Sequence, residues 1–166
     1  MSELKALMTG HPRLTLAVAE SITSGRLQAH VGAISGASEF YLGGITAYTL
    51  DQKVRHLGVD PVEAASCNCV SARVAEQMAR GVCVLFGSDV GAATTGYAEP
   101  SEEWGVSDPF ACWAFAFRRR DGHFLVASGR GVFGGHTRTE VQERAASAAL
   151  EALVRWIRET AAARRL

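Results

Sequence analysis

Residues 14–25, LTLAVAESITSG, decide the fold class of this chain. The run Leu14–Ala19 is almost continuously apolar, which is typical of a β-strand covered on both faces. A polar turn ends it, and residues 25–33 then predict a helix with Thr23 or Ser24 as its N-cap. A buried strand, a tight turn and a helix in direct succession are typical of an α/β fold.

The rest of the chain continues this alternation of strands and helices. Apolar and β-branched runs predict further strands, and helical periodicity bounded by capping residues predicts further helices. Asp121 and Gly122 predict a hairpin turn between the last two strands. The predicted strands are 44–49, 90–94, 110–117 and 123–133, and the predicted helices are 51–57 (N-cap Asp51), 72–86 (N-cap Ser71) and 141–157. This order predicts an α/β sandwich with a mixed sheet.

The composition is typical of a single globular domain over residues 1–166. Seventeen basic residues balance seventeen acidic ones, and this zero net charge argues against a nucleic-acid partner. No apolar run approaches the roughly 20 residues of a membrane span, and the N-terminus does not resemble a signal peptide. We therefore expect a cytoplasmic protein with reduced cysteines and no membrane partner. The four cysteines and five histidines lack metal-ligand spacing, so we expect no metal and no cofactor.

The turn after the first strand is where chemistry is expected first. Ser21 lies beyond the carboxyl end of a predicted strand, where open α/β sheets bind ligands. Backbone N–H groups at the start of the following helix can hold an anion or a developing oxyanion. Serine and threonine also cap helices frequently, so a purely structural role for this turn stays open.

A serine nucleophile needs a base, and the sequence contains no G-x-S-x-G motif of a hydrolase triad. Lys5 and Lys53 are the only lysines among the seventeen basic residues. A buried lysine can be kept neutral and accept a proton, whereas arginine stays charged. Lys53 follows the second predicted strand, and one helical turn can bring its amine back toward Tyr48. The alternative is a solvated lysine on a short surface helix.

Several motifs in order resemble the CinA C-terminal domain family, the nicotinamide-nucleotide amidohydrolases, which carry competence- and damage-inducible names. AESITSG at 19–25 resembles the family segment A-E-S-x-T-G/A-G, and SGASEFYLGG at 35–44 resembles G-S-S-x-x-F-x-x-G. YTLDQK at 48–53 resembles Y-S-N-x-x-K. Further matches include the positions 95–96 and 133–138, so the resemblance covers essentially the whole chain.

The resemblance implies a three-layer α/β/α sandwich with a mixed, mainly parallel sheet of about five strands. It also implies metal-free hydrolysis of nicotinamide mononucleotide to nicotinic acid mononucleotide and ammonia, a step in NAD metabolism. By position, Ser21 would be the nucleophile, Lys53 its base, and Tyr48 a partner that relays a proton or orients the amine. The matched positions also imply substrate contacts, at Glu20, Thr23, Ser24, Gly25, Thr95, Gly96 and Arg138.

The ligand-facing residues depart from the family pattern. The family's glycine-rich loop is replaced at 96–105 by GYAEPSEEWG, which contains Glu99, Glu102 and Glu103. If these three carboxylates line the mouth of the site, their repulsion of a phosphate should weaken binding of the mononucleotide more than of the riboside. The alternative is that the loop bends away from the site and the carboxylates are solvated. Other departures are Leu50 for Asn, Asn68–Cys69 for Gly-Ala, and one residue inserted near Gly135–Arg138.

Two functions therefore stay open at this point. The first is a Ser-Lys amidohydrolase acting on nicotinamide mononucleotide or a related small amide. The alternative is a catalytically diverged relative that acts as a small-molecule binding or regulatory module. Release of ammonia from a nicotinamide substrate distinguishes the two.

One predicted strand is crowded with aromatic residues at positions 110, 113, 115 and 117. Alternate residues of a strand face opposite sides of the sheet, and the C-terminal helix can cover only one of them. The other side needs a helix or a second subunit. We therefore predict a homo-oligomer.

Overall fold

The computed structural model describes residues 2–163, with side chains up to Thr160; residues 1 and 164–166 lie outside the described part. Five strands form one sheet in the order β2-β1-β3-β4-β5. β1 is parallel to both β2 and β3, whereas β4 is antiparallel to both β3 and β5. Four strands therefore run in one direction and β4 alone runs in the other. The strands are β1 (Leu16–Glu20), β2 (Tyr41–Thr46), β3 (Val90–Tyr97), β4 (Phe110–Arg118) and β5 (Phe124–Val132).

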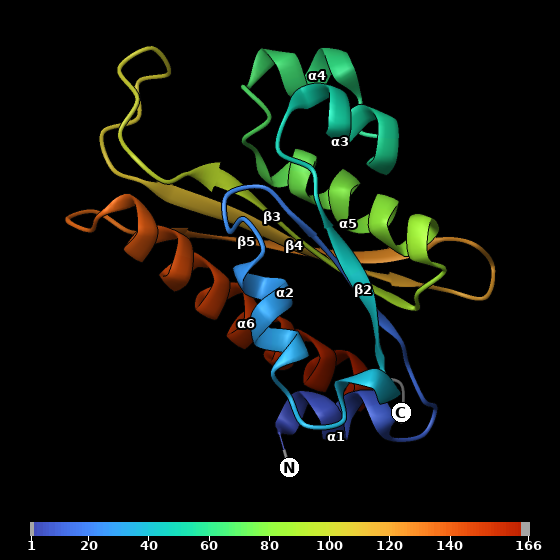
Figure 1. The fold of residues 1–166 in the computed structure, drawn as a ribbon. Helices are drawn as coiled ribbons and strands as arrows, with labels where there is room; N and C mark the ends of the chain where they lie inside the picture. Colours follow the sequence, from blue (N-terminus) through green and yellow to red (C-terminus); the bar gives the residue numbers. More distant parts are fainter. Residues whose placement is uncertain (1, 164–166) are drawn as a thin grey trace.

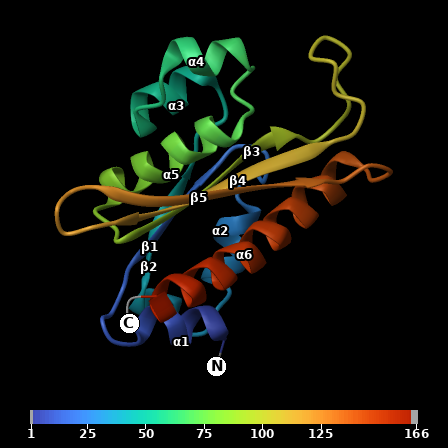
Figure 2. The same ribbon diagram turned by 180° about the vertical axis from the view of Figure 1, so that it is seen from behind.

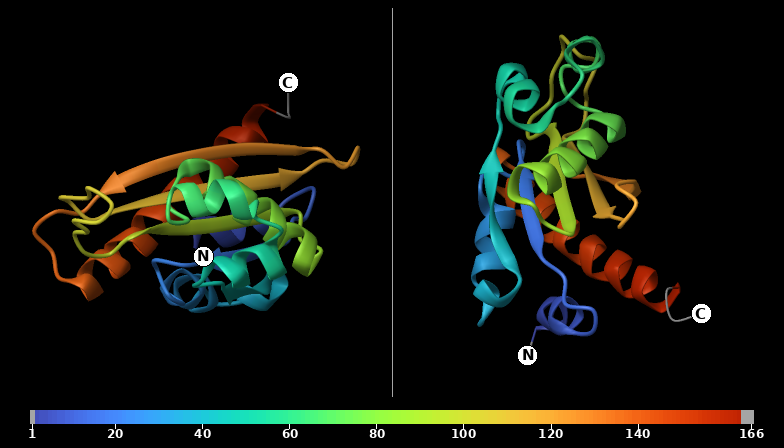
Figure 3. Two further views of the ribbon diagram at one scale, coloured as in Figure 1. Left: turned by 90° about the horizontal axis from the view of Figure 1, so that it is seen from above. Right: turned by 90° about the vertical axis from the view of Figure 1, so that its right-hand side faces the viewer.

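Helices cover both faces of the sheet, which confirms the predicted three-layer α/β/α sandwich (Figures 1 and 2). A short 3₁₀ helix, η1 (Ala37–Glu39), precedes β2. The first face carries α1 (Glu3–Thr9), α2 (Arg26–Gly32) and α6 (Arg138–Ala163), and the second carries α3 (Leu50–Leu57), α4 (Pro61–Ser66) and α5 (Ala72–Phe86). The loop between β3 and β4 and the beginning of α6 lie at the same end of the sheet (Figure 3, left).

β1 is buried along its whole length because helices pack on both of its faces. Leu16 and Val18 belong to the core that α2 and α6 cover, and Ala17 and Ala19 belong to the core that α5 covers. At the carboxyl end of β1, Glu20 is paired with residues of both neighbouring strands. The turn that follows β1 therefore emerges in the interior of the sheet, between β2 and β3.

The long helices and the hairpin agree with the sequence-based predictions. The Ser71 hydroxyl accepts the N–H of Val74 at the start of α5, and Gly87 ends that helix in the left-handed conformation. The predicted hairpin turn joins β4 and β5 at Asp121, whose carboxylate accepts the N–H of His123. The predicted C-terminal helix is α6, and its apolar stripe is buried at positions 141, 145, 149, 153 and 157.

Some boundaries differ from the predictions. β2 spans 41–46 instead of 44–49, because pairing with β1 rather than strand propensity sets its limits. Thr49, not Asp51, is the N-cap of α3, and its hydroxyl accepts the N–H of Gln52. The helices α1 and α4 were not predicted, since seven and six residues are too short for a clear helical period.

The aromatic strand β4 is covered on both faces within one chain. Trp113, Phe115 and Phe117 pack into the core under α6, and the Phe115 ring lies 5.6 Å from the Trp156 ring. Phe110 packs on the opposite side, against the core that α5 covers. The aromatic residues therefore need no second subunit to cover them. The homo-oligomer stays a prediction, but an uncovered aromatic face no longer supports it.

No helix within residues 2–163 combines the length and apolar character that crossing a membrane requires. All four cysteines are free thiols. In the described part of the chain, no three or more His, Cys, Asp or Glu side chains are grouped so that they could hold a metal ion. The cytoplasmic location stays a prediction.

Candidate active site

A cavity of about 440 Å³ lies at the carboxyl ends of β1, β2 and β3. Its walls come from the turn after β1, the start of α3, the loop before α5, the end of β3 and the start of α6. The lining residues are Ser21, Ile22, Tyr48, Thr49, Leu50, Lys53, Asn68, Cys69, Val70, Thr95, Gly96, Tyr97, Ala98, Glu99, Pro100, Ser101 and Arg138. The volume suits a small molecule.

Ser21 and Lys53 meet at the floor of this cavity. The Lys53 amine lies 3.0 Å from the Ser21 hydroxyl oxygen, within hydrogen-bond distance. Lys53 is 1% exposed, and no salt bridge to it is found in the described part of the chain. Burial lowers the pKa of Lys53 from its ordinary value of 10.5, and the neighbouring Cys69 opposes this effect. The amine therefore loses its proton more readily than an exposed lysine does.

The helix α3 explains why a lysine points into the interior. Lys53 and Leu57 are the buried residues of α3, four positions apart on the same face. Lys53 thus occupies a core position of an amphipathic helix, which excludes the predicted alternative of a solvated surface lysine. The helix also returns the amine to its own N-terminal side, where it donates to the carbonyl oxygen of Tyr48 at 2.7 Å.

Tyr48 contacts the lysine through its backbone and not through its phenol. The side chain is 52% exposed, and the phenol oxygen accepts a hydrogen bond from Arg138 at 2.8 Å. The family resemblance implied that Tyr48 hydrogen-bonds to Lys53 and either relays a proton or orients the Lys53 amine. The structure keeps the orienting contact but moves it to the carbonyl oxygen, a group that every residue type supplies.

The buried carboxylate of Glu20 organises the turn that presents Ser21. It accepts the Thr23 hydroxyl and the N–H groups of Gly25 (3.0 Å), Leu27 (3.1 Å) and Gln28 (2.8 Å). The prediction that Thr23 or Ser24 caps α2 was wrong: Gly25 is the N-cap, with a φ of 95°, and Glu20 satisfies the helix N-terminus. A carboxylate that reaches forward from the preceding strand satisfies more N–H groups than one hydroxyl can.

This cap also removes the start of α2 from ligand binding. Its N–H groups are bonded to Glu20, so they do not form the anion site that sequence reasoning expected there. Ile22 lines the cavity, and its N–H group has no hydrogen-bond partner among residues 2–163. Four residues expected to touch substrate lie outside the cavity lining and hold the turn instead: Glu20, Thr23, Ser24 and Gly25.

The loop before α5 adds two residues to the cavity wall that the sequence did not single out as a site, Asn68 and Cys69. Asn68 and Cys69 adopt left-handed backbone angles, with φ of 49° and 61°. The Thr95 hydroxyl donates to the Cys69 carbonyl oxygen at 2.7 Å and fixes this strained loop against β3. Burial raises the pKa of the Cys69 thiol, so the thiol stays protonated beside Lys53. The departure from Gly-Ala at 68–69 was the only sequence signal for this wall.

Two of the remaining predicted substrate contacts lie on β3. Thr95 and Gly96 both line the cavity. A Cβ at Gly96 would lie 2.3 Å from the carbonyl oxygen of Phe110, so the close approach of β4 explains this glycine.

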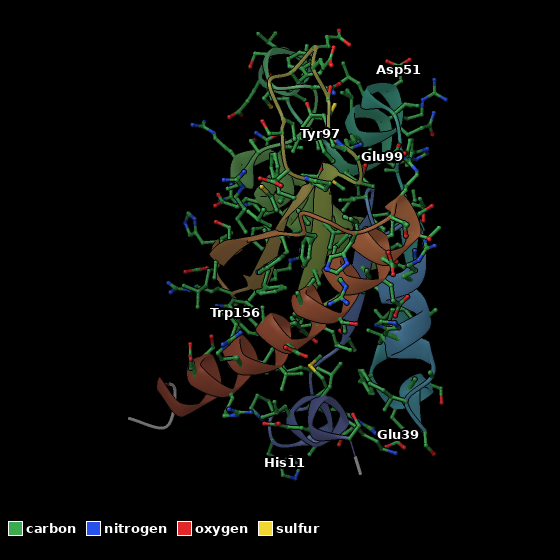
Figure 4. The ribbon with its side chains drawn as sticks, turned by 90° about the vertical axis from the view of Figure 1, so that its left-hand side faces the viewer. His11, Glu39, Asp51, Tyr97, Glu99 and Trp156 are labelled. Carbon is green, nitrogen blue, oxygen red and sulfur yellow. The ribbon has the colours of Figure 1, made fainter. Side chains whose placement is uncertain are left out.

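Arg138, at the first position of α6, lies at the rim of the cavity. Its guanidinium donates to the Glu99 carboxylate at 2.6 Å and to the Tyr48 phenol oxygen at 2.8 Å. Glu99 raises the pKa of Arg138 above its ordinary value, with smaller contributions from Tyr48. Glu99 and Tyr97 lie at the same end of the molecule as Asp51 of α3, far from His11 and Trp156 (Figure 4).

Only one of the three loop carboxylates reaches the site. Glu99 lines the cavity, whereas Glu102 and Glu103 do not. Two backbone hydrogen bonds between Ser101 and Val106 close the loop on itself. Glu102 and Glu103 lie in the exposed turn between these two residues. The structure therefore agrees with the solvated alternative for Glu102 and Glu103, and only Glu99 lies at the mouth of the site.

Comparison with known proteins agrees with this architecture. The model of the CinA C-terminal domain family matches residues 2–157. The chain belongs to the CinA C-terminal domain family. A CinA-like protein of Chlorobium limicola is 34% identical over 160 residues, which is 96% of this chain and 37% of that protein. A putative competence-damage inducible protein of Moorella thermoacetica is 48% identical over 87 residues, 52% of this chain and 21% of that protein. The chain therefore spans well under half the length of these relatives.

Solved structures of the family share the fold. A CinA superfamily protein from Enterobacter cloacae superposes with a TM-score of 0.83 at 29% identity, covering 93% of this chain and 88% of that one. A CinA superfamily protein from Klebsiella pneumoniae also gives a TM-score of 0.83, at 27% identity, with 95% and 94% covered. The sandwich built around β1 is thus the family fold.

Proposed function

We propose that this domain is an amidohydrolase that converts the carboxamide of nicotinamide mononucleotide, or of a related nicotinamide compound, to the carboxylic acid and ammonia. The observation that supports this most is the buried Lys53 amine 3.0 Å from the Ser21 hydroxyl, with no carboxylate paired to it among the described residues. A neutral amine in that position is a general base for a serine nucleophile.

The first half of the reaction uses the groups at the cavity floor. The Ser21 hydroxyl oxygen attacks the carboxamide carbon while its proton moves to Lys53. One Lys53 N–H stays bonded to the Tyr48 carbonyl and holds the nitrogen 3.0 Å from the Ser21 oxygen, where the lone pair of the neutral amine can accept the hydroxyl proton. The N–H of Ile22 is the candidate donor to the oxyanion, because Ile22 lines the cavity and this N–H has no partner within residues 2–163.

The second half returns the enzyme to its starting state. The Lys53 ammonium gives its proton to the leaving nitrogen, so that ammonia departs and an acyl ester on Ser21 remains. Water then attacks the ester while Lys53 takes its proton, the bond to the Ser21 oxygen breaks, and Lys53 returns the proton to Ser21 as the carboxylic acid is released. The sum is one amide and one water converted to one acid and one ammonia, with no metal taking part.

Ammonia release from nicotinamide mononucleotide, nicotinamide riboside and nicotinamide tests the proposal. We expect release from at least one of them, and we expect Ser21→Ala to lower it by about 1,000-fold or more, since no other hydroxyl replaces the nucleophile. Ser66→Ala, the same change at an exposed helix end, is the matched control and retains full activity. Full activity in Ser21→Ala would contradict the proposal.

The diverged binding module is the second candidate. The contact of Glu99 with Arg138 favours it, because the rim cation is already occupied. It predicts that nicotinamide compounds bind without releasing ammonia. Saturable binding with no turnover on any of the three substrates would support this candidate over the amidohydrolase.

A further inference from the structure

The charged side chains that line the cavity are few, and they separate into a floor and a rim. Lys53 lies at the floor, where it is buried and bonded to Ser21 and to the Tyr48 carbonyl oxygen. Arg138 and Glu99 lie at the rim, with side chains 45% and 59% exposed. A ligand whose amide reaches Ser21 therefore meets Arg138 and Glu99 with its distal end.

Both terminal nitrogens of the Arg138 guanidinium already have partners in this arrangement. One guanidinium nitrogen is 2.6 Å from a Glu99 oxygen, and the other donates to the Tyr48 phenol oxygen at 2.8 Å. A phosphate approaching Arg138 must displace Glu99 or sit beside its carboxylate. Displacement loses a charge-assisted hydrogen bond, and coexistence brings two anions together in a partly desolvated rim.

The backbone holds both partners in place. Glu99 follows β3 by two residues, after the buried Ala98, and precedes the loop that the Ser101–Val106 bridge closes. Arg138 opens α6, where the Glu140 carboxylate accepts the N–H of Thr137 at 2.8 Å and its hydroxyl at 2.6 Å. The pair therefore joins two anchored segments that lie 39 positions apart in sequence.

We infer that Glu99 determines the substrate class of this site: by occupying Arg138 it selects a carboxamide without a phosphate over its phosphorylated counterpart. The inference rests on the proposed amide hydrolysis and narrows its substrate. Among nicotinamide compounds it assigns the riboside rather than the mononucleotide. The riboside lacks the phosphate, and its pyridinium cation is attracted rather than repelled by the Glu99 carboxylate.

The test measures binding of both compounds by calorimetry to the Ser21→Ala protein, in which turnover is blocked. We expect the riboside to bind more tightly than the mononucleotide. Glu99→Gln in this background should tighten mononucleotide binding about tenfold at low salt and leave riboside binding equal or weaker. Adding Arg138→Gln to Glu99→Gln should abolish the gain, because the freed guanidinium is its source.

Glu102→Gln is the matched control, since it removes the same charge from the same loop outside the cavity lining. It should change neither affinity. Equal changes for both ligands in Glu99→Gln, or none, would overturn the selection by Glu99 and leave the hydrolysis proposal standing if the wild-type protein releases ammonia. Absence of binding for both compounds in every variant would overturn this inference, and it would overturn the proposed function as well if the wild-type protein releases ammonia from none of the three substrates.

Discussion

The floor and the rim of the cavity are built from the same kinds of polar group but differ in burial. At the floor, Lys53 is 1% exposed and its pKa is lowered by loss of water. At the rim, Glu99 and Arg138 stay largely in solvent, where an ion pair contributes only about 0–1 kcal/mol to stability. Burial thus shifts the pKa of Lys53 and suits it for proton transfer. The exposed side chains at the rim stay charged and can select between ligands of different charge. Chemistry and selectivity should therefore respond separately to mutation.

Lys53→Arg should have the largest effect of the substitutions that test this separation. Arginine keeps the positive charge but cannot accept a proton near neutral pH, so ammonia release should fall about 100- to 1,000-fold. The chain offers a matched control in its other lysine. Lys5→Arg changes a surface residue that is paired with Glu39, and it should retain activity. Comparable turnover in Lys53→Arg would show that the floor does not supply the base.

Glu20→Gln tests the support beneath the floor. The carboxylate accepts three backbone N–H groups, and an amide has one acceptor oxygen and a donor nitrogen that these groups repel. We expect a loss of about 2–3 kcal/mol in the free energy of unfolding, measured by urea denaturation. Glu39→Gln removes an exposed carboxylate instead and should lower the free energy of unfolding far less than Glu20→Gln does. Equal losses in the two variants would contradict the capping role of Glu20.

The pH dependence of stability tests the ionisation of Lys53 directly. Because burial lowers its pKa in the folded protein, the unfolded chain binds more protons between that pKa and 10.5, and stability rises with pH through this window. Lys53→Met removes the titrating group. It should raise the free energy of unfolding by about 1 kcal/mol at neutral pH and flatten its rise toward pH 10. An unchanged slope would show that the amine titrates normally. Ammonia release by the wild type should rise as pH approaches the lowered pKa of Lys53 and level off above it.

Tyr48→Phe should have the smallest effect, because Lys53 is held by the backbone carbonyl that phenylalanine retains. We expect less than about a threefold change in kcat, the scale of one lost exposed hydrogen bond. The phenol contacts Arg138, so any effect should appear mainly in KM. A loss of about 100-fold in kcat would instead indicate that the Tyr48 phenol relays a proton.

Periodicity and capping chemistry were sufficient to predict most of the layers. The apolar run of β1, the capped helix α5 and the stripe of α6 all agree with the structure, because each depends on residues close together in sequence. The juxtaposition of Ser21 with Lys53 was also predicted, from strand order and a family resemblance. The short helices α1 and α4 were missed because they contain too few turns to show a period.

The amino-acid sequence by itself determined the strand–turn–helix unit at 14–33 and singled out Lys53 as one of only two lysines, since local pattern and composition reveal both. That Lys53 is buried was decided by the tertiary structure. Only the tertiary structure decided that Glu20 caps α2, that the Tyr48 carbonyl holds Lys53, and that Glu99 alone among the loop acids reaches Arg138. These outcomes depend on which polar groups are enclosed together and must satisfy one another. Such partners are chosen by packing between distant segments, and residue type does not specify them.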